Sequence, residues 1–203
     1  MLNSELSMGG KVGVKKITPP GPGAAWKLRN STRPAFVWGW LTNGAARAFS
    51  SLTGIPTLTS ELSVSLIRAD GGRVNYGVVS RRVITTAFVN FMVDQLQTET
   101  SVWGDFKFHD AGVGTTAAAI TDTTIETTDG ESRATGSQTE GAANVYVSVG
   151  TISYTSTKAV TEHGLFNDAT TGTLLDRHVF TAVNVVSGDS VQFTYSLTVS
   201  SGG

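Results

Sequence analysis

The chain has 203 residues, three histidines and no cysteine, and its formal net charge is −1. This length suits one domain with a sizeable core. The lack of cysteine excludes disulfides, cysteine–zinc sites and thiol catalysis. No apolar run approaches the ~20 residues of a membrane helix, and residues 1–6 lack the basic start and apolar stretch of a signal peptide. We expect a product made in the cytoplasm, without a membrane partner.

The small net charge hides a division along the chain. Residues 1–100 carry 11 of the 15 basic residues and 5 of the 16 acidic ones, and residues 101–203 carry the rest. The pattern favours an N-terminal part that meets an anionic surface and a C-terminal part that faces water. Charges that are merely solvated are the alternative. The bases are dispersed and accompany no nucleic-acid-binding motif, so we do not expect DNA or RNA as a partner.

Residues 1–35 are expected to form an extended basic arm, followed by one domain over residues 36–203. Three of the five prolines lie in Thr18–Gly23, which excludes a helix or a central strand there. Lys11–Ile17 alternates and suggests an edge strand that pairs only on contact with another surface. The arm has too little apolar area to order itself. We therefore expect it to lie across a neighbouring subunit.

Ala35–Leu41 is the most aromatic stretch of the chain. Its two tryptophans favour core or subunit-interface packing, because tryptophan buries a large area with little loss of entropy. An exposed platform that stacks on a host-surface glycan is the alternative. The expected contacts with a capsid or a second subunit are the bases of the arm and these aromatic residues: Lys11, Lys15, Lys16, Lys27, Arg29, Arg33, Phe36, Trp38 and Trp40.

The first clear strands follow after residue 60. Glu61–Arg68 and Arg73–Val78 alternate on either side of Ala69–Gly72, which has the residues of a hairpin turn. Ser80 then has the features of an N-cap, and apolar residues at helical spacing predict one helix near residues 82–97.

The next stretch, residues 112–144, is rich in Thr, Gly and Ala and predicts short strands and surface loops. Within it, Gly112–Thr116 has the look of a phosphate-binding loop. It lacks the lysine that such a loop requires before its Ser or Thr, so we expect no nucleotide and no other cofactor.

The C-terminal part repeats the strand pattern. Val145–Val149 has valines at alternate positions, and the apolar parity changes after Gly150, which predicts a bulge. Leu175–Val185 is a second alternating run, interrupted by Arg177. Val191–Val199 alternates without an error. With only one helical pattern, we expect an all-β fold, mainly an antiparallel β-sandwich or jelly roll, with the one helix and the extended arm.

The histidines give the sharpest catalytic hypothesis. His163 follows Glu162, and His178 follows Asp176 and Arg177, on strands that could be neighbours. Adjacent residues of a strand point to opposite faces, so Glu162 and His163 cannot bind one metal together. No metal-ligand spacing is present. We favour a structural role in which Glu162 or Asp176 pairs with Arg177, and we expect no catalytic residue and no metal. A pair of carboxylates brought together by the fold is the open alternative.

Several segments of the second half form a set of turn and strand motifs: Phe106–His109, Gly112–Ala117, Asp122–Thr124, Thr161–Phe166 and Asn184–Tyr195. Together they resemble a group of tailed-bacteriophage virion structural proteins, β-rich components associated with head decoration or tail fibres. The resemblance covers roughly the C-terminal half and, more loosely, the predicted helix. It implies a location in the virion and brings no catalytic residues with it.

The resemblance leads us to expect a capsid decoration (cement) protein that binds and stabilises the head shell through its arm. Many weak contacts give such a protein avidity. The expected partners are the major capsid protein or other virion proteins and further copies of the chain, as a trimer. The alternative is a tail fibre, tail adaptor or receptor-binding component, although the chain shows neither heptads nor repeats. A polysaccharide-degrading enzyme is a third hypothesis, which we do not favour.

Overall fold

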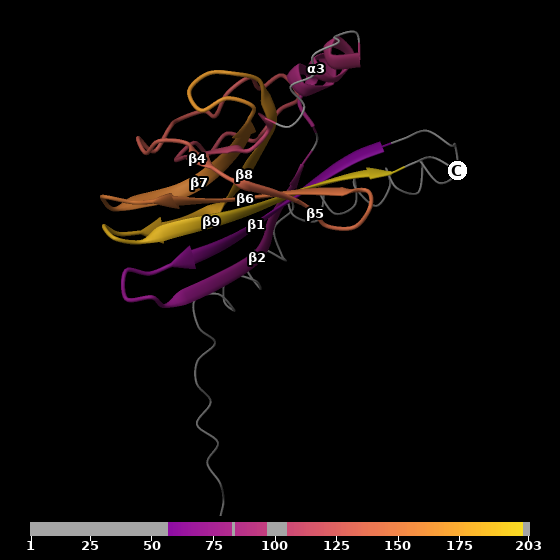
Figure 1. The fold of residues 1–203 in the computed structure, drawn as a ribbon. Coiled ribbons are helices and arrows are strands. Elements are labelled where there is room, and N and C mark those ends of the chain that lie inside the picture. Colours follow the sequence, from indigo (N-terminus) through magenta and orange to yellow (C-terminus); the bar gives the residue numbers. More distant parts are fainter. Residues whose placement is uncertain (1–56, 83, 97–104, 201–203) are drawn as a thin grey trace, which may run out of the picture.

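Two antiparallel sheets face each other in a sandwich (Figure 1). The structure is a computed structural model and describes residues 57–82, 84–96 and 105–200. The five-stranded sheet contains, in spatial order, β2 (Arg73–Arg82), β1 (Thr57–Ile67), β9 (Ser190–Ser200), β6 (Val145–Ser153) and β5 (Ser137–Glu140). The four-stranded sheet contains β4 (Ala134–Thr135), β3 (Phe108–Gly112), β7 (Lys158–Phe166) and β8 (Leu174–Val185). The predicted all-β class with one helix is confirmed.

Strand β9 is the centre of the five-stranded sheet because it pairs with β1 on one side and β6 on the other. Its alternation is the one predicted from the sequence, with the apolar residues buried up to Leu197 and the Ser, Thr and Gln positions partly exposed. The core between the sheets contains the inward residues of β1 and β9: Leu62, Val64, Leu66, Val191, Phe193 and Tyr195.

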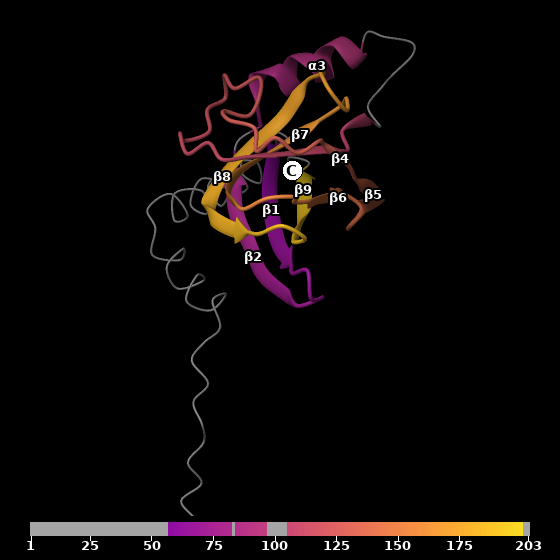
Figure 2. The ribbon, with the colours of Figure 1, turned by 90° about the vertical axis from the view of Figure 1, so that its left-hand side faces the viewer.

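The helix α3 (Thr86–Leu96) lies at one end of the sandwich, next to β8 (Figure 2). The predicted N-cap, Ser80, is wrong. Ser80 lies in β2 opposite Leu62, because the β-branched pair that precedes it extends the hairpin strand. Thr85 caps the helix instead, and its Oγ1 accepts a hydrogen bond from the Phe88 amide at 3.2 Å.

The predicted bulge after Gly150 is also wrong. Strand β6 pairs with β9 in one continuous register from Val145 to Ser153. Its buried face contains Ser148, Gly150 and Ile152, whereas the valines at alternate positions are on the other face. The parity of the sequence changes because His109 of the facing sheet fills the space over the small residues Ser148 and Gly150 of β6.

Within the described ranges, no helix has the length and apolar character needed to cross a membrane. The expected arm of residues 1–35, the edge strand at Lys11–Ile17 and the aromatic stretch Ala35–Leu41 all lie outside the residues that the structure describes.

Candidate functional site

The four-stranded sheet places the polar residues singled out in the sequence on its two faces. In the β7–β8 pairing, His163 lies opposite His178, and Gly164 lies opposite Arg177. Opposed residues of an antiparallel pair share a face, and the next residue along each strand lies on the other face. Glu162 and Arg177 therefore share the outer face. His163 and His178 share the inner face, which packs on the five-stranded sheet.

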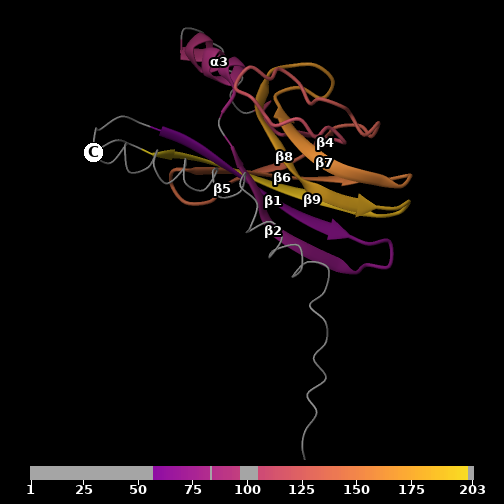
Figure 3. The same cartoon turned by 180° about the vertical axis from the view of Figure 1, so that it is seen from behind.

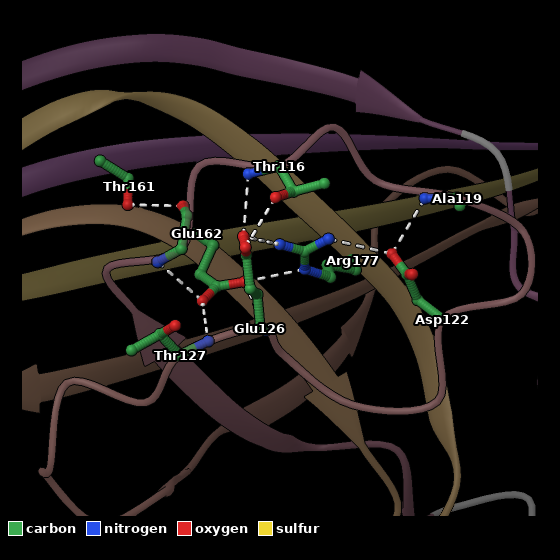
Figure 4. A network of polar contacts seen from close by, with 9 residues as sticks. Thr116, Ala119, Asp122, Glu126, Thr127, Thr161, Glu162 and Arg177 are labelled. Carbon is green, nitrogen blue, oxygen red and sulfur yellow. Dashed lines mark hydrogen bonds and ion pairs between the residues drawn. The ribbon is translucent and has the colours of Figure 1, made fainter.

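On the outer face, the Glu162 carboxylate is the centre of a hydrogen-bond network (Figure 4). Oε1 accepts the amides of Gly114 at 2.9 Å and Thr127 at 2.8 Å. Oε2 accepts the amide of Glu126 at 2.9 Å and Arg177 Nε at 2.8 Å. The side chain is fully buried, and these four donors replace the water that the charge has lost.

Arg177 extends the network to the loop that covers this face, residues 113–127, which we call the outer loop. Its Nη1 lies 3.1 Å from Asp122 Oδ2, and its Nη2 lies 3.2 Å from Glu126 Oε2. Hydrogen bonds from the hydroxyl and amide of Thr116 lower the pKa of Glu126. Each nitrogen of the guanidinium thus faces a carboxylate of its own chain, and the loop is fastened to the sheet at both ends.

The glycines of Gly112–Thr116 have an internal explanation in this network. A Cβ on Gly114 would lie 2.4 Å from Glu162 Oε1, and one on Gly112 would lie 2.5 Å from the same atom. The segment does surround an anion with glycines and backbone amides, as a phosphate-binding loop does. The anion is Glu162 of the same chain, so the segment holds the outer loop in place.

The inner face contains the three histidines, all fully buried, which we call the histidine row. His109 Nε2 lies 2.8 Å from Ser148 Oγ, and His109 Nδ1 lies 2.9 Å from His163 Nε2. The rings of His163 and His178 follow at 6.4 Å between centroids. The row crosses β3, β7 and β8 and faces the centre of the five-stranded sheet, where the His163 ring packs 4.6 Å from Phe193.

A carboxylate closes the row at its β8 end. His178 Nε2 lies 3.1 Å from Asp176 Oδ2, and the same oxygen accepts a short hydrogen bond from the Ser60 hydroxyl of β1. Burial raises the pKa of Tyr195, and the charge of Asp176 raises it further. The result is a polar line through the core that joins strands of both sheets.

At the other end of the row, burial holds His109 and His163 in their neutral form. Burial lowers the pKa of His109 to about 3. Burial also lowers the pKa of His163 well below its usual value, and the neighbouring His109 and His178 lower it further. A neutral imidazole can donate from one nitrogen and accept at the other, which suits the Ser148–His109–His163 contacts. Protonation would place a second donor where an acceptor is needed.

Two glycines make room for His109 between the sheets. A Cβ on Gly150 would lie 2.4 Å from His109 Cδ2, and one on Gly136 would lie 2.7 Å from His109 Nε2. This packing explains the small residues on the buried face of β6 and hence the parity change read as a bulge. Sequence reasoning missed the contact, since the only signal was Ser148 and Gly150 in a strand of valines.

The predicted pairing of Arg177 is confirmed for Glu162. Asp176 does not pair with Arg177, because it lies on the opposite face and contacts His178 instead. Within the described ranges, no group of three or more His, Cys, Asp or Glu side chains is arranged to hold a metal ion. A shallow pocket of about 370 Å³ opens beside the outer network and is lined by Thr116, Asp122 and Arg177. The contacts on the outer face hold the outer loop to the sheet, and those on the inner face hold the two sheets together.

The nine residues predicted to contact a capsid or a second subunit all precede Thr57 and lie outside the described residues. Comparisons with protein-family models, curated proteins and solved structures found no match.

Proposed function

We propose that the chain is a structural protein of a tailed-phage virion, a capsid decoration protein. Its acidic β-sandwich projects from the head shell and its basic N-terminal arm binds the shell. The observation that carries the proposal is the charge on either side of Thr57, the first residue of β1. Residues 1–56 contain seven bases and one acid, whereas the described residues contain eight bases and fourteen acids. The basic excess thus ends where the sandwich begins, and the acidic excess lies in residues 105–200, which contain four bases and eleven acids.

The chemistry of the sandwich supports a structural role. Its buried carboxylates contact bases across strands and loops, as in Glu162 with the buried Arg177 and Asp189 with the partly exposed Arg68. Such contacts fix a shape, and the partly or fully exposed residues still include more acids than bases. An acidic surface keeps a protein soluble and keeps dense neighbours apart, while a basic arm is drawn to an anionic shell. The resemblance of its turn and strand motifs to virion structural proteins, drawn from the sequence alone, led to this proposal.

The test is binding of the full chain to expanded capsids of the cognate phage. Lys15→Glu together with Lys16→Glu reverses two charges of the arm and should weaken co-sedimentation at least tenfold. The matched control is Arg73→Glu with Lys158→Glu, which reverses two charges of the sandwich and should leave binding within twofold. Raising the salt concentration should weaken the binding of the unaltered protein to capsids, because salt screens the attraction between separated charges.

Equal loss in both double variants would contradict binding through the arm. The number of copies per virion tests the class of component: decoration requires many copies spread over the head, whereas a few copies confined to the tail would indicate a fibre or adaptor. Light scattering of the free protein tests the expected trimer.

A further inference from the structure

One end of the five-stranded sheet has a core-facing surface that no strand of the four-stranded sheet covers. Along β9 the inward residues are buried up to Leu197, but Val199, which continues the same parity, is 45% exposed. Val199 lies opposite Leu58 of β1. The five-stranded sheet extends past its partner at this end, where β1 starts, β9 ends and β5 turns into β6 (Figures 1 and 3).

This end of the sheet contains an open pocket of about 540 Å³. Its lining is apolar at Ala143, Val145, Tyr146 and Val199 and polar at Gln138, Thr139, Glu140 and Asn144. Hydrogen bonds hold its frame, since the Val199 amide donates to Asn144 O at 3.0 Å and Asn144 Nδ2 donates to Val199 O at 3.1 Å. An apolar hollow of this size on a framed surface suits large apolar side chains.

The position at which the chain enters the sheet limits what can fill the pocket. Thr57 pairs with Ser200, and Val145 pairs with Thr198 on the other side of β9. Two strand spacings, or about 10 Å, therefore separate the start of β1 from the pocket. The chain that precedes Thr57 reaches this point in every molecule, so its segments are present at a high effective concentration.

The segment of that chain with matching chemistry is Phe36–Leu41. It contains Phe36, Trp38 and Trp40, and each aromatic side chain can bury roughly 150–250 Å². Residues 42–56 join it to β1 and could span up to about 50 Å when extended, more than the distance needed to fold back. Arg33 before it and Arg47 after it are bases whose charge complements Glu140 in the pocket lining.

We propose that Phe36–Leu41 of the same chain binds in the pocket formed by β5, β6 and the end of β9. The segment completes the core where the four-stranded sheet ends and fixes the point from which residues 1–35 leave the sandwich. This inference does not rest on the proposed function, because it concerns the free protein.

Cysteine pairing tests the proposal cleanly, since the chain has no cysteine of its own. Gly39→Cys lies between the two tryptophans, and Ala143→Cys lies in the exposed turn at the pocket. In dilute full-length protein with oxidised glutathione, this pair should form a disulfide within one molecule. The control pair, Gly39→Cys with Ser187→Cys, places the second thiol in the exposed turn before β9, about 35 Å away along the strand. It should form a disulfide at least tenfold more slowly.

A charge in the pocket provides the second measurement. Val199→Glu in the first cysteine pair should slow disulfide formation at least fivefold. Val186→Glu is the matched control, because Val186 is 49% exposed but lies in the turn at the far end of β9. Equal rates for the two cysteine pairs, or no response to Val199→Glu, would overturn the proposal. Disulfide-linked dimers in place of monomers would assign the pocket to the segment of a neighbouring copy and overturn it as well. None of these results would change the outcome expected from the capsid-binding test.

Discussion

The two faces of the four-stranded sheet bury ionisable groups in opposite ways. Glu162 and His163 are neighbours in the sequence and both are fully buried. On the outer face, Glu162 has an arginine and three backbone amides as donors. On the inner face, His163 lies among histidines and an aromatic ring, and its pKa falls well below its usual value. A buried charge needs donors, whereas a buried base without an acid beside it loses its charge.

The difference assigns a separate task to each face. The outer network fastens the outer loop to the sheet, because three of the four donors to Glu162 are backbone amides of that loop. The histidine row and the adjoining Asp176 fasten the two sheets to each other, because His109 bonds to Ser148 of β6 and Asp176 accepts a hydrogen bond from Ser60 of β1. A substitution on the outer face should therefore affect the outer loop, whereas one on the inner face should affect the whole sandwich.

The largest effect is expected for Glu162→Ala. The change leaves three backbone amides and the buried Arg177 Nε without their acceptor, and breaking a buried pair by removing one partner costs about 3–5 kcal/mol. The measurement is urea unfolding of the full chain at neutral pH. Glu140→Ala, in the exposed strand β5, is the control and should change the free energy of unfolding by less than about 0.5 kcal/mol. A loss under 1 kcal/mol for Glu162→Ala would contradict the central place of this carboxylate.

The next effect is expected for Gly150→Ala, on the other face. The added Cβ would lie 2.4 Å from His109 Cδ2, and overpacking of a core costs about 1–3 kcal/mol. Thr151→Ala, at the exposed neighbouring position, is the control. Because the added methyl group pushes on His109, nuclear magnetic resonance signals of the His109 and His163 rings should shift in Gly150→Ala and stay in place in Thr151→Ala. Unchanged ring signals with unchanged stability would remove the packing argument.

How far the sequence could predict this arrangement follows from the range of each contact. Period-two alternation is local, so it correctly placed Glu162 and His163 on opposite faces and gave β9 its buried side. The pairing of Glu162 with Arg177 needed only the β7–β8 hairpin, and it was predicted as one of two choices. These inferences required neighbouring strands and nothing more distant.

The errors came from contacts between segments far apart in the chain. The parity change after Gly150 predicts a bulge when β6 is considered alone, but His109 from the other sheet explains it. Ser80 looks like a cap unless its pairing with Leu62 is known. The amides that bind Glu162 belong to a loop whose closure leaves no periodic signal, so residue types alone did not reveal the cradle.

The histidine row should make the sandwich sensitive to acid. His109 has a pKa of about 3 when folded and about 6.5 when unfolded. The unfolded chain therefore binds more protons between these values, and stability falls as the pH drops below about 6.5. Each such histidine contributes a slope of up to about 1.36 kcal/mol per pH unit. The other titratable groups in the row and beside it are His163 of β7, His178 and Asp176 of β8, Tyr195 of β9 and Tyr146 of β6.

The measurement is the free energy of unfolding between pH 7 and pH 5 for the unaltered chain and for His109→Gln. The glutamine keeps polar contact with Ser148 but does not titrate, so the slope against pH should become smaller by up to about 1.36 kcal/mol per unit. Carboxylates outside the row contribute equally to both proteins and cancel in the difference. Identical slopes would show that His109 is protonated to the same extent in the folded and unfolded chains.

The smallest effect is expected for Asp122→Ala, which tests how the outer network divides its work. Asp122 contacts Arg177 Nη1 at 3.1 Å and accepts the Ala119 amide at 2.9 Å, but it is partly open to solvent. A partly exposed ion pair contributes about 1 kcal/mol or less, so global stability should change little. Hydrogen exchange should increase at the Ala119 amide, while the amides of Gly114 and Thr127, which bind Glu162, remain protected. Faster exchange at all three amides would show that the outer loop opens as one unit and that Asp122 and Glu162 hold it jointly.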